Sequence, residues 1–246
     1  IWFERTYVLT SRIWIVDSKR LMETTGMPLP RFNKMPEEKK EQIFEAAAKE
    51  FADNGYEGAV LSRILERAGI SKGAAYYYFE DKADLIATVI RRYWVDFLDE
   101  PTAQVEDYTA GDFWEKLRAL YLHPFDIIVS QPWMLGFSKA VWHLPEEIRM
   151  SGPLGEVFSE AIEWVRGFVR RGFELQVIRD DLPEDLMVNL IMALDHVHDE
   201  WMSDHWEEMG KSEFEAFTST YVDFMQRALE SPDRDIPEME SGGMTS

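Results

Sequence analysis

The chain has 246 residues, 46% of them hydrophobic, so it can bury the core of one large domain or of two smaller ones. It contains no cysteine, which excludes disulfide frameworks and thiolate metal sites and fits a reducing cytoplasm. Charges interrupt the apolar runs every few residues, so we expect no membrane-spanning helix and a cytoplasmic protein.

The net charge of −20 is distributed unevenly along the chain. Residues 1–36 hold 6 Lys/Arg against 3 Asp/Glu, residues 37–82 hold 7 against 10, and residues 83–246 hold 13 against 33. The first 82 residues are therefore close to neutral, and the acidity belongs to the rest. Only the N-terminal third could meet a phosphate-bearing partner, and it would do so through a limited number of contacts.

Both ends of the chain read as segments outside the folded part. Residues 1–35 are interpreted as a leader or flexible arm, because Gly26 to Pro30 has the composition of a linker. A disordered leader is favoured over a basic arm with a binding role. Residues 231–246, rich in Pro, Gly, Ser and acidic residues, are predicted to be a disordered tail.

From Pro36 onward the pattern is helical. Pro36 fits a first helical position, and Glu37 and Glu38 lie near the positive end of the helix dipole. Asn54-Gly55 ends this helix. Its apolar stripe consists of Ile43, Phe44, Ala47, Phe51 and Ala52.

Further helices follow along the whole chain. Short helices are predicted over 60–68 and 71–79, and Asp81 caps a long helix that continues to about residue 99. Two long helices, over about 183–206 and 212–229, end the fold. No segment alternates with period two between hairpin turns, so an all-α fold without a sheet is predicted. Other helix starts are indicated by two capping-box patterns and three prolines: Asp112 with Glu115, Ser212 with Glu215, Pro132, Pro153 and Pro183.

The turn between the two short helices is typical of a helix-turn-helix. Gly69 permits the left-handed turn residue, so the helices can cross steeply. Ser71 can accept a hydrogen bond from a backbone N–H one turn into the second helix. Small residues at Gly73, Ala74 and Ala75 then let the backbone of that helix approach a surface closely.

Three tyrosines and two lysines complete this segment. The hydroxyls of Tyr76, Tyr77 and Tyr78 can donate to phosphate, and their rings can stack on sugar or a thymine methyl group. Lys72 and Lys82 bracket the helix, and Lys82 suits a phosphate better than it suits the dipole of the helix it begins. The alternative is that the tyrosines are core residues. Three adjacent side chains span roughly 300° of a helix, so at least one must be exposed.

These residues resemble the tetracycline-repressor (TetR) family of transcriptional regulators over residues 37–86. The resemblance implies an all-α homodimer whose second helix-turn-helix helix enters the major groove of DNA. It also implies a helical C-terminal domain that binds a small effector. The residues that carry the resemblance are Phe51, Gly55-Tyr56, Ile64, Ala68-Gly69-Ile70-Ser71-Lys72-Gly73, Tyr76-Tyr77-Tyr78-Phe79, Lys82 and Leu85.

By motif position, the resemblance implies base or phosphate contacts for seven residues, to which the cap Ser71 is added: Lys72, Gly73, Ala74, Tyr76, Tyr77, Tyr78 and Lys82. The chain departs from the family at Val60, where Ser or Thr usually caps the second helix and contacts a phosphate. Ser62 and Arg63 are the candidates to replace that contact. Leu65 stands where alanine is common, and Tyr78 where histidine is frequent.

The resemblance divides the chain into a helix-turn-helix domain over 36–82 and an effector-binding and dimerisation domain over 83–230. Most of the large aromatics between residues 94 and 173 are expected to be core, and some to line a pocket for an apolar or aromatic ligand. The candidate effector-binding residues are Trp94, Phe97, Arg118, Tyr121, Trp133, Phe137 and Phe168.

The last two helices are the predicted dimer interface, although a monomeric core would show similar apolar stripes. The run from Asp195 to Glu200, with His205, could suggest a metal site. It does not bring three ligands together, and His198 lies two turns from His205, so a polar rim of the interface is favoured and no metal or cofactor is expected.

The sequence therefore predicts a repressor that a small hydrophobic or aromatic effector releases from a palindromic double-stranded DNA operator. The alternative is an architectural or constitutive DNA-binding regulator without an effector. An all-α enzyme is disfavoured, because no nucleophile, base and orienting group occur at a supportive spacing.

Overall fold

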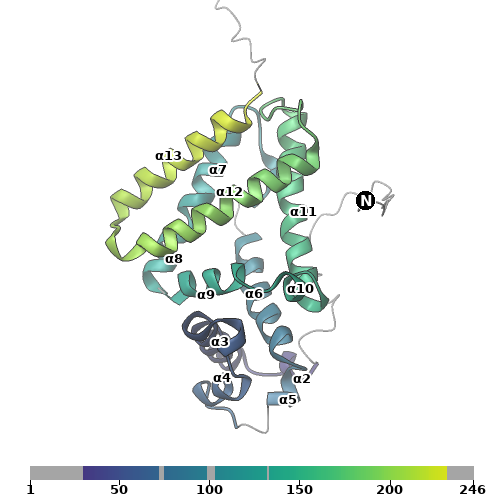
Figure 1. Cartoon of the computed structure of the whole chain (residues 1–246), viewed down its shortest axis with the longest axis vertical. Helices are drawn as coiled ribbons and strands as arrows, with labels where there is room; N and C mark the ends of the chain where they lie inside the picture. Colours follow the sequence, from purple (N-terminus) through teal and green to yellow (C-terminus); the bar gives the residue numbers. More distant parts are fainter. Residues whose placement is uncertain (1–29, 72–74, 99–102, 132, 232–246) are drawn as a thin grey trace, which may run out of the picture.

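A computed structural model describes residues 30–71, 75–98, 103–131 and 133–231 of the chain (Figure 1). Over these residues the protein is helical, and its single β-type contact is an isolated bridge between Ile178 and Glu230. The predicted all-α class is confirmed. Most of the predicted leader (1–29) and tail (232–246) lies outside the described residues.

The α-helices of the described residues run in chain order from α2 to α13, with two short 3-10 segments between them. Their bounds are α2 Pro30–Asn33, α3 Glu37–Gly58, α4 Leu61–Arg67, α5 Ala75–Tyr78, α6 Lys82–Leu98, η3 Val105–Asp107, α7 Phe113–Leu122, α8 Pro124–Ser130, α9 Trp133–Trp142, α10 Glu146–Arg149, α11 Gly152–Glu174, α12 Glu184–His205, η4 Trp206–Glu208 and α13 Lys211–Leu229.

The helices form two lobes that α6 and α9 connect. In Figure 1, helices α2 to α5 gather at the lower end, and we call this part, with the first half of α6, the head. Helices α7, α11, α12 and α13 form the upper lobe, and α9 lies across α3 between the two. The upper lobe has a core of its own, separate from that of the head, which centres on the rings of Tyr108, Phe113 and Phe168.

Local signals place the helix ends of the head. Gly55 has a φ of +63°, so α3 is interrupted at the predicted Asn54-Gly55 stop and adds one more turn beyond it. Gly69 has a φ of +67°, and two hydrogen bonds close α4 there: Gly69 N–H to the Glu66 carbonyl and Ile70 N–H to that of Leu65. This is the Schellman ending that a glycine after a helix favours.

Two predicted capping boxes are wrong in detail. The Asp112 carboxylate accepts from the backbone N–H of Thr109 at 2.7 Å and pairs with Lys116, so it caps nothing in α7. Helix α13 begins at Lys211 after Gly210 in an extended conformation, so Ser212 lies inside the helix rather than before it. In both cases the sequence pattern of a capping box is present, but no side chain caps the first turn of the helix.

The predicted domain boundaries at residues 35 and 82 do not coincide with breaks in packing. Phe32 is 2% exposed and belongs to the core of the head, so the folded part begins before residue 36. That same core continues into the upper lobe through Phe137 and Leu154. On α9, a Cβ at Gly136 would stand 2.9 Å from the Cβ of Ala52, which shows how closely α9 approaches α3.

Candidate DNA-binding site

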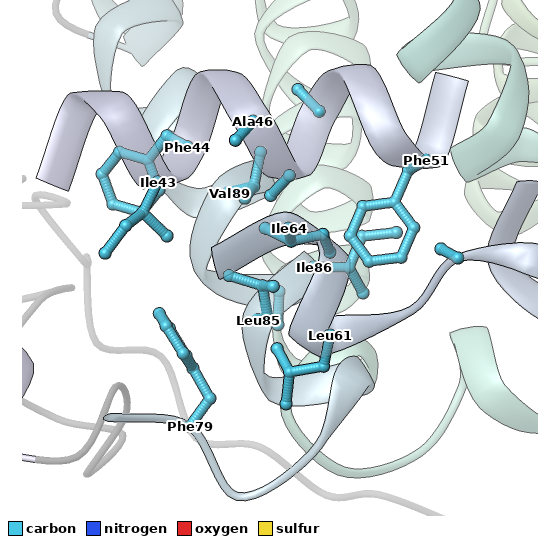
Figure 2. Close-up of a cluster of buried hydrophobic side chains, with 14 of the residues drawn as sticks. Ile43, Phe44, Ala46, Phe51, Leu61, Ile64, Phe79, Leu85, Ile86 and Val89 are labelled. Atoms are coloured by element: carbon cyan, nitrogen blue, oxygen red, sulfur yellow. The ribbon is translucent and has the colours of Figure 1, made fainter. Parts of the chain in front are cut away.

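A compact apolar core positions the helix-turn-helix. Figure 2 shows side chains of α3, α4 and α6 converging beneath α3, with Phe79 at the edge of the cluster. Ile43, Ile64, Phe79 and Leu85 are all inaccessible to solvent. Since Phe79 directly follows α5, its burial fixes the end of α5 against the rest of the head.

A reciprocal cap fixes the start of α6 immediately after α5. The backbone N–H of Asp84 donates to Asp81 Oδ1 at 2.8 Å, and Asp84 Oδ2 accepts from the N–H of Glu80 at 2.9 Å. The predicted Asp81 cap is thereby confirmed. Asp84 is only 2% exposed, and desolvation raises the pKa of its carboxyl.

The tyrosines of α5 divide between solvent and core. Tyr77 is 47% exposed, whereas Tyr78 is half-buried and packs edge-on against Tyr77 and Phe32, with ring centroids 5.0 and 6.4 Å away. The prediction that at least one tyrosine faces solvent is confirmed. The side chain of Tyr76 and the whole of Lys72, Gly73 and Ala74 lie outside what the structure describes, and Ser71 is exposed just before that gap.

Lys82 has a partner within the protein. Its Nζ donates to the carbonyl oxygen of Tyr56 at 2.5 Å and lies 4.4 Å from the centroid of the Tyr56 ring. The ammonium therefore serves the last turn of α3, where a helix leaves carbonyl groups unpaired. A phosphate contact by Lys82 stays a prediction, and it would require the ammonium to be shared with Tyr56.

Glu50 organises the start of α4, and the sequence reasoning missed it. Its side chain is inaccessible to solvent, and Oε1 accepts from Arg63 Nη1 at 2.6 Å and from the N–H of Val60 at 3.3 Å. Arg67 pairs with the other carboxylate oxygen at 3.1 Å. Arg63 keeps 46% of its side chain exposed, and Ser62 is half-buried, so both retain access to a ligand. The available signal was an acidic residue three positions after Ala47, on the apolar stripe of α3.

The five predicted effector-binding residues whose side chains the structure describes lie in different parts of the molecule. Phe137 and Trp133 pack into the core shared with the head, while Phe168 is 1% exposed among the rings of the upper lobe. Arg118 binds the Ser219 carbonyl and the Asp223 carboxylate at 2.7 and 2.6 Å. The side chains of Trp94 and Phe97, on α6, are not among those that the structure describes.

Tyr121 belongs to a polar network between α7, α12 and α13. Tyr121 and Tyr221 both donate to Asp195 Oδ1, and burial raises the pKa of the Asp195 carboxyl to about 6. The ring of His198 lies 4.3 Å from that of Tyr221, and its Nδ1 is 3.2 Å from Asp199. In the described ranges, no three His, Asp or Glu side chains are grouped as a metal site would need.

An apolar strip remains uncovered on the last two helices. Leu186, Leu190, Val197 and Trp201 of α12 are 44%, 41%, 64% and 39% exposed, and their spacing of four or seven residues places them on one face. Phe224 of α13 is 54% exposed. Large apolar side chains gathered in this way are typical of an interface.

None of the helices that the structure describes has both the length and the apolar composition needed to cross a membrane.

Comparisons with known proteins show that the chain is similar to bacterial regulators. The family model "Bacterial regulatory proteins, tetR family" matches residues 43–89. The transcriptional activator FasR of Mycolicibacterium smegmatis is 36% identical over 99 residues, which are 40% of this chain and 44% of that protein. The transcriptional repressor KstR2 of the same organism is 26% identical over 181 residues, which are 71% of this chain and 82% of KstR2.

A solved structure extends the likeness to the fold of most of the chain. The regulator FadR from Bacillus subtilis, solved in complex with stearoyl-CoA, superposes with a TM-score of 0.62. The superposition covers 78% of this chain and 100% of that protein, at 20% sequence identity. The chain thus spans less than half of FasR but the whole length of this structural neighbour.

Proposed function

This chain belongs to the TetR family of bacterial regulatory proteins, and on that premise we propose that it is a repressor that leaves its operator when a small effector binds. The single observation that carries DNA binding is the head itself. The buried Phe79 and the Asp81–Asp84 cap fix the chain directly after α5 at the end of the molecule, with Tyr77 facing solvent. A rigid helix that presents hydroxyl groups can dock in a major groove and contact phosphates.

The proposal includes a homodimer formed through α12 and α13. The exposed strip of Leu186, Leu190, Val197 and Trp201, with Phe224, would be removed from water when two copies pack around a two-fold axis. Two heads related by such an axis match a palindromic operator, whose half-sites are spaced by whole turns of DNA. Because its partner is DNA, we place the protein in the cytoplasm.

We further assign the effector to the upper lobe, as an apolar or aromatic molecule. The seven candidate residues remain proposals, and each of the two polar candidates would have to exchange a partner: Arg118 would leave Asp223, and Tyr121 would leave Asp195. The stearoyl-CoA bound by FadR makes long-chain acyl thioesters a natural first probe.

Two contacts would transmit effector binding to the head. Helix α9 lies against α3 at Gly136 and Ala52, so a shift of α9 displaces α3. Arg91 of α6 is 5% exposed and pairs with Glu160 of α11 at 3.3 Å, which ties the helix that leaves the head to the upper lobe. An effector acts through these contacts only if it binds better to the arrangement that cannot hold the operator.

Selection of binding sites from a random duplex pool tests DNA recognition directly. A palindromic consensus is expected, and the absence of any enriched sequence would refute the proposal. Release of the selected duplex by stearoyl-CoA or by members of an aromatic compound panel then tests the effector. An operator that no such compound releases would favour the alternative, a constitutive or architectural regulator.

A further inference from the structure

Helix α2 is anchored beside the recognition helix. Phe32 is 2% exposed, and its ring packs against those of Phe44, Phe79 and Tyr78 at 5.6, 5.0 and 6.4 Å. A large aromatic side chain so buried fixes the short helix that carries it. Residues on either side of Phe32 are therefore held at the edge of α5.

Two cationic side chains on or next to α2 lie beside Tyr77 and Tyr78 of α5. Arg31 and Lys34 are exposed, and the Arg31 guanidinium lies 4.3 Å from the centroid of the Tyr77 ring. Together with Met35, Pro36, Tyr77 and Tyr78, these two side chains line a hollow of about 440 Å³. Stacking on an aromatic face leaves the edge of the guanidinium and its N–H groups free to bind an anion.

The other cations in the described part of the head already have oxygen partners. Over the described head residues 30–71 and 75–92, only Arg31 and Lys34 have neither a carboxylate nor a carbonyl oxygen as partner. The remaining cations and their partners are Lys39 with the Ala68 carbonyl, Lys40 with Glu37, Lys49 with Glu45, Arg63 and Arg67 with Glu50, Lys82 with the Tyr56 carbonyl, Arg91 with Glu160 and Arg92 with Glu41.

We propose that Arg31 and Lys34 bind backbone phosphates of the operator beside the groove that α5 enters. The inference rests on the proposed function and adds a second contacting element to it. An unpaired cation gains a phosphate without losing an internal ion pair, whereas Arg63 or Lys82 must give up or share its partner. Duplex DNA is the favoured polyanion because the hollow shares Tyr77 with the recognition helix.

The test measures affinity for a duplex selected by the wild-type protein as a function of salt concentration. Each phosphate contact contributes about 0.9 to the slope of log K against log salt, so Arg31→Gln and Lys34→Gln should each lower the slope by about 1. Each should weaken binding by roughly two- to fivefold, as exposed charge contacts do. The preference for the selected duplex over a scrambled one should not change, because phosphates carry no sequence information.

Lys49→Gln is the matched control, because it removes one positive charge from the same head where the lysine already pairs with Glu45. Its salt slope should equal that of the wild type. An equal loss of affinity in all three variants would show an effect of net charge alone and would overturn the inference. A salt slope equal to that of the wild type in the double variant Arg31→Gln/Lys34→Gln would also overturn it. Failure of the wild type to bind any selected duplex would instead refute the proposed function. Thermal unfolding of each variant confirms that the head remains folded.

Discussion

Replacing Gly136 by alanine measures how tightly α9 lies on α3. The new Cβ would stand 2.9 Å from the Cβ of Ala52 and 3.6 Å from its Cα. The first distance is well inside the optimum of about 3.5–4.0 Å for two carbon atoms. Overpacking of this kind costs roughly 1–3 kcal/mol, while exchanging a helical glycine for alanine otherwise gains roughly 0.5–1 kcal/mol. We therefore expect a net loss of about 0.5–2 kcal/mol in the free energy of unfolding.

Gly167→Ala provides the control for helix propensity. A Cβ at Gly167, inside α11, would meet Val105 Cγ2 at 3.7 Å, an ordinary contact, so this variant should gain roughly 0.5–1 kcal/mol. Adding Ala52→Gly to Gly136→Ala removes the close Cβ pair. The double-mutant cycle should then show a favourable coupling of about 1–3 kcal/mol between the two positions.

Urea unfolding followed by circular dichroism gives these free energies, at one protomer concentration because the stability of the proposed dimer depends on it. Operator affinity measured on the same variants shows whether the contact also carries the signal to the head. Equal gains for Gly136→Ala and Gly167→Ala, with no coupling in the cycle, would refute the close approach of α9 and α3.

Three further predictions follow from the polar network around Asp195, the apolar strip of α12 and the contacts of Phe32 on α2. The pKa of Asp195 is raised to about 6 in the folded protein, so its stabilising contribution is present below the unfolded value near 4 and lost as the pH rises through 6. Asp195→Asn, which still accepts from both tyrosines, should therefore gain up to about 3 kcal/mol at pH 7.5 and less at pH 5.5, and equal gains at both pH values would contradict this. Val197→Glu places a charge on a residue that is 64% exposed in one protomer; sedimentation should show monomers and operator affinity should fall, whereas an unchanged dimer would exclude this face. Phe32→Ala should cost about 3–5 kcal/mol in urea unfolding, and a loss below about 1 kcal/mol would mean that α2 is not part of the core.

Local signals in the sequence were sufficient to predict the structure of the helix-turn-helix. The left-handed Gly69 and the Asp81 cap are properties of a few neighbouring residues, so their pattern predicts their structure without knowledge of the rest of the fold. The exposure of Tyr77 follows from helix geometry alone. These elements were therefore predictable, and the structure confirms them.

Contacts between distant segments were not predictable in this way. The partner of Lys82 is a carbonyl 26 positions earlier, and Glu50 joins α3 to Arg63, 13 positions later. Phe32 falls within the predicted leader, and its burial depends on rings far away in the sequence, those of Phe44, Tyr78 and Phe79. The aromatic-rich composition between residues 94 and 173 gave no means of separating core rings from ligand-binding rings, because rings of both kinds are apolar.

The continuity of the apolar core between head and upper lobe, through Phe137 and Leu154, has a practical consequence for ligand discovery. Helix α11 contributes Leu154 to this core and Phe168 to the separate core of the upper lobe, so heating should produce a single melting transition rather than two. A molecule held only by the upper lobe would then raise the melting temperature of the entire chain. At one hundred times its Kd it would add about 2.7 kcal/mol. Compounds could thus be ranked by thermal shift in the absence of DNA, before any operator is known.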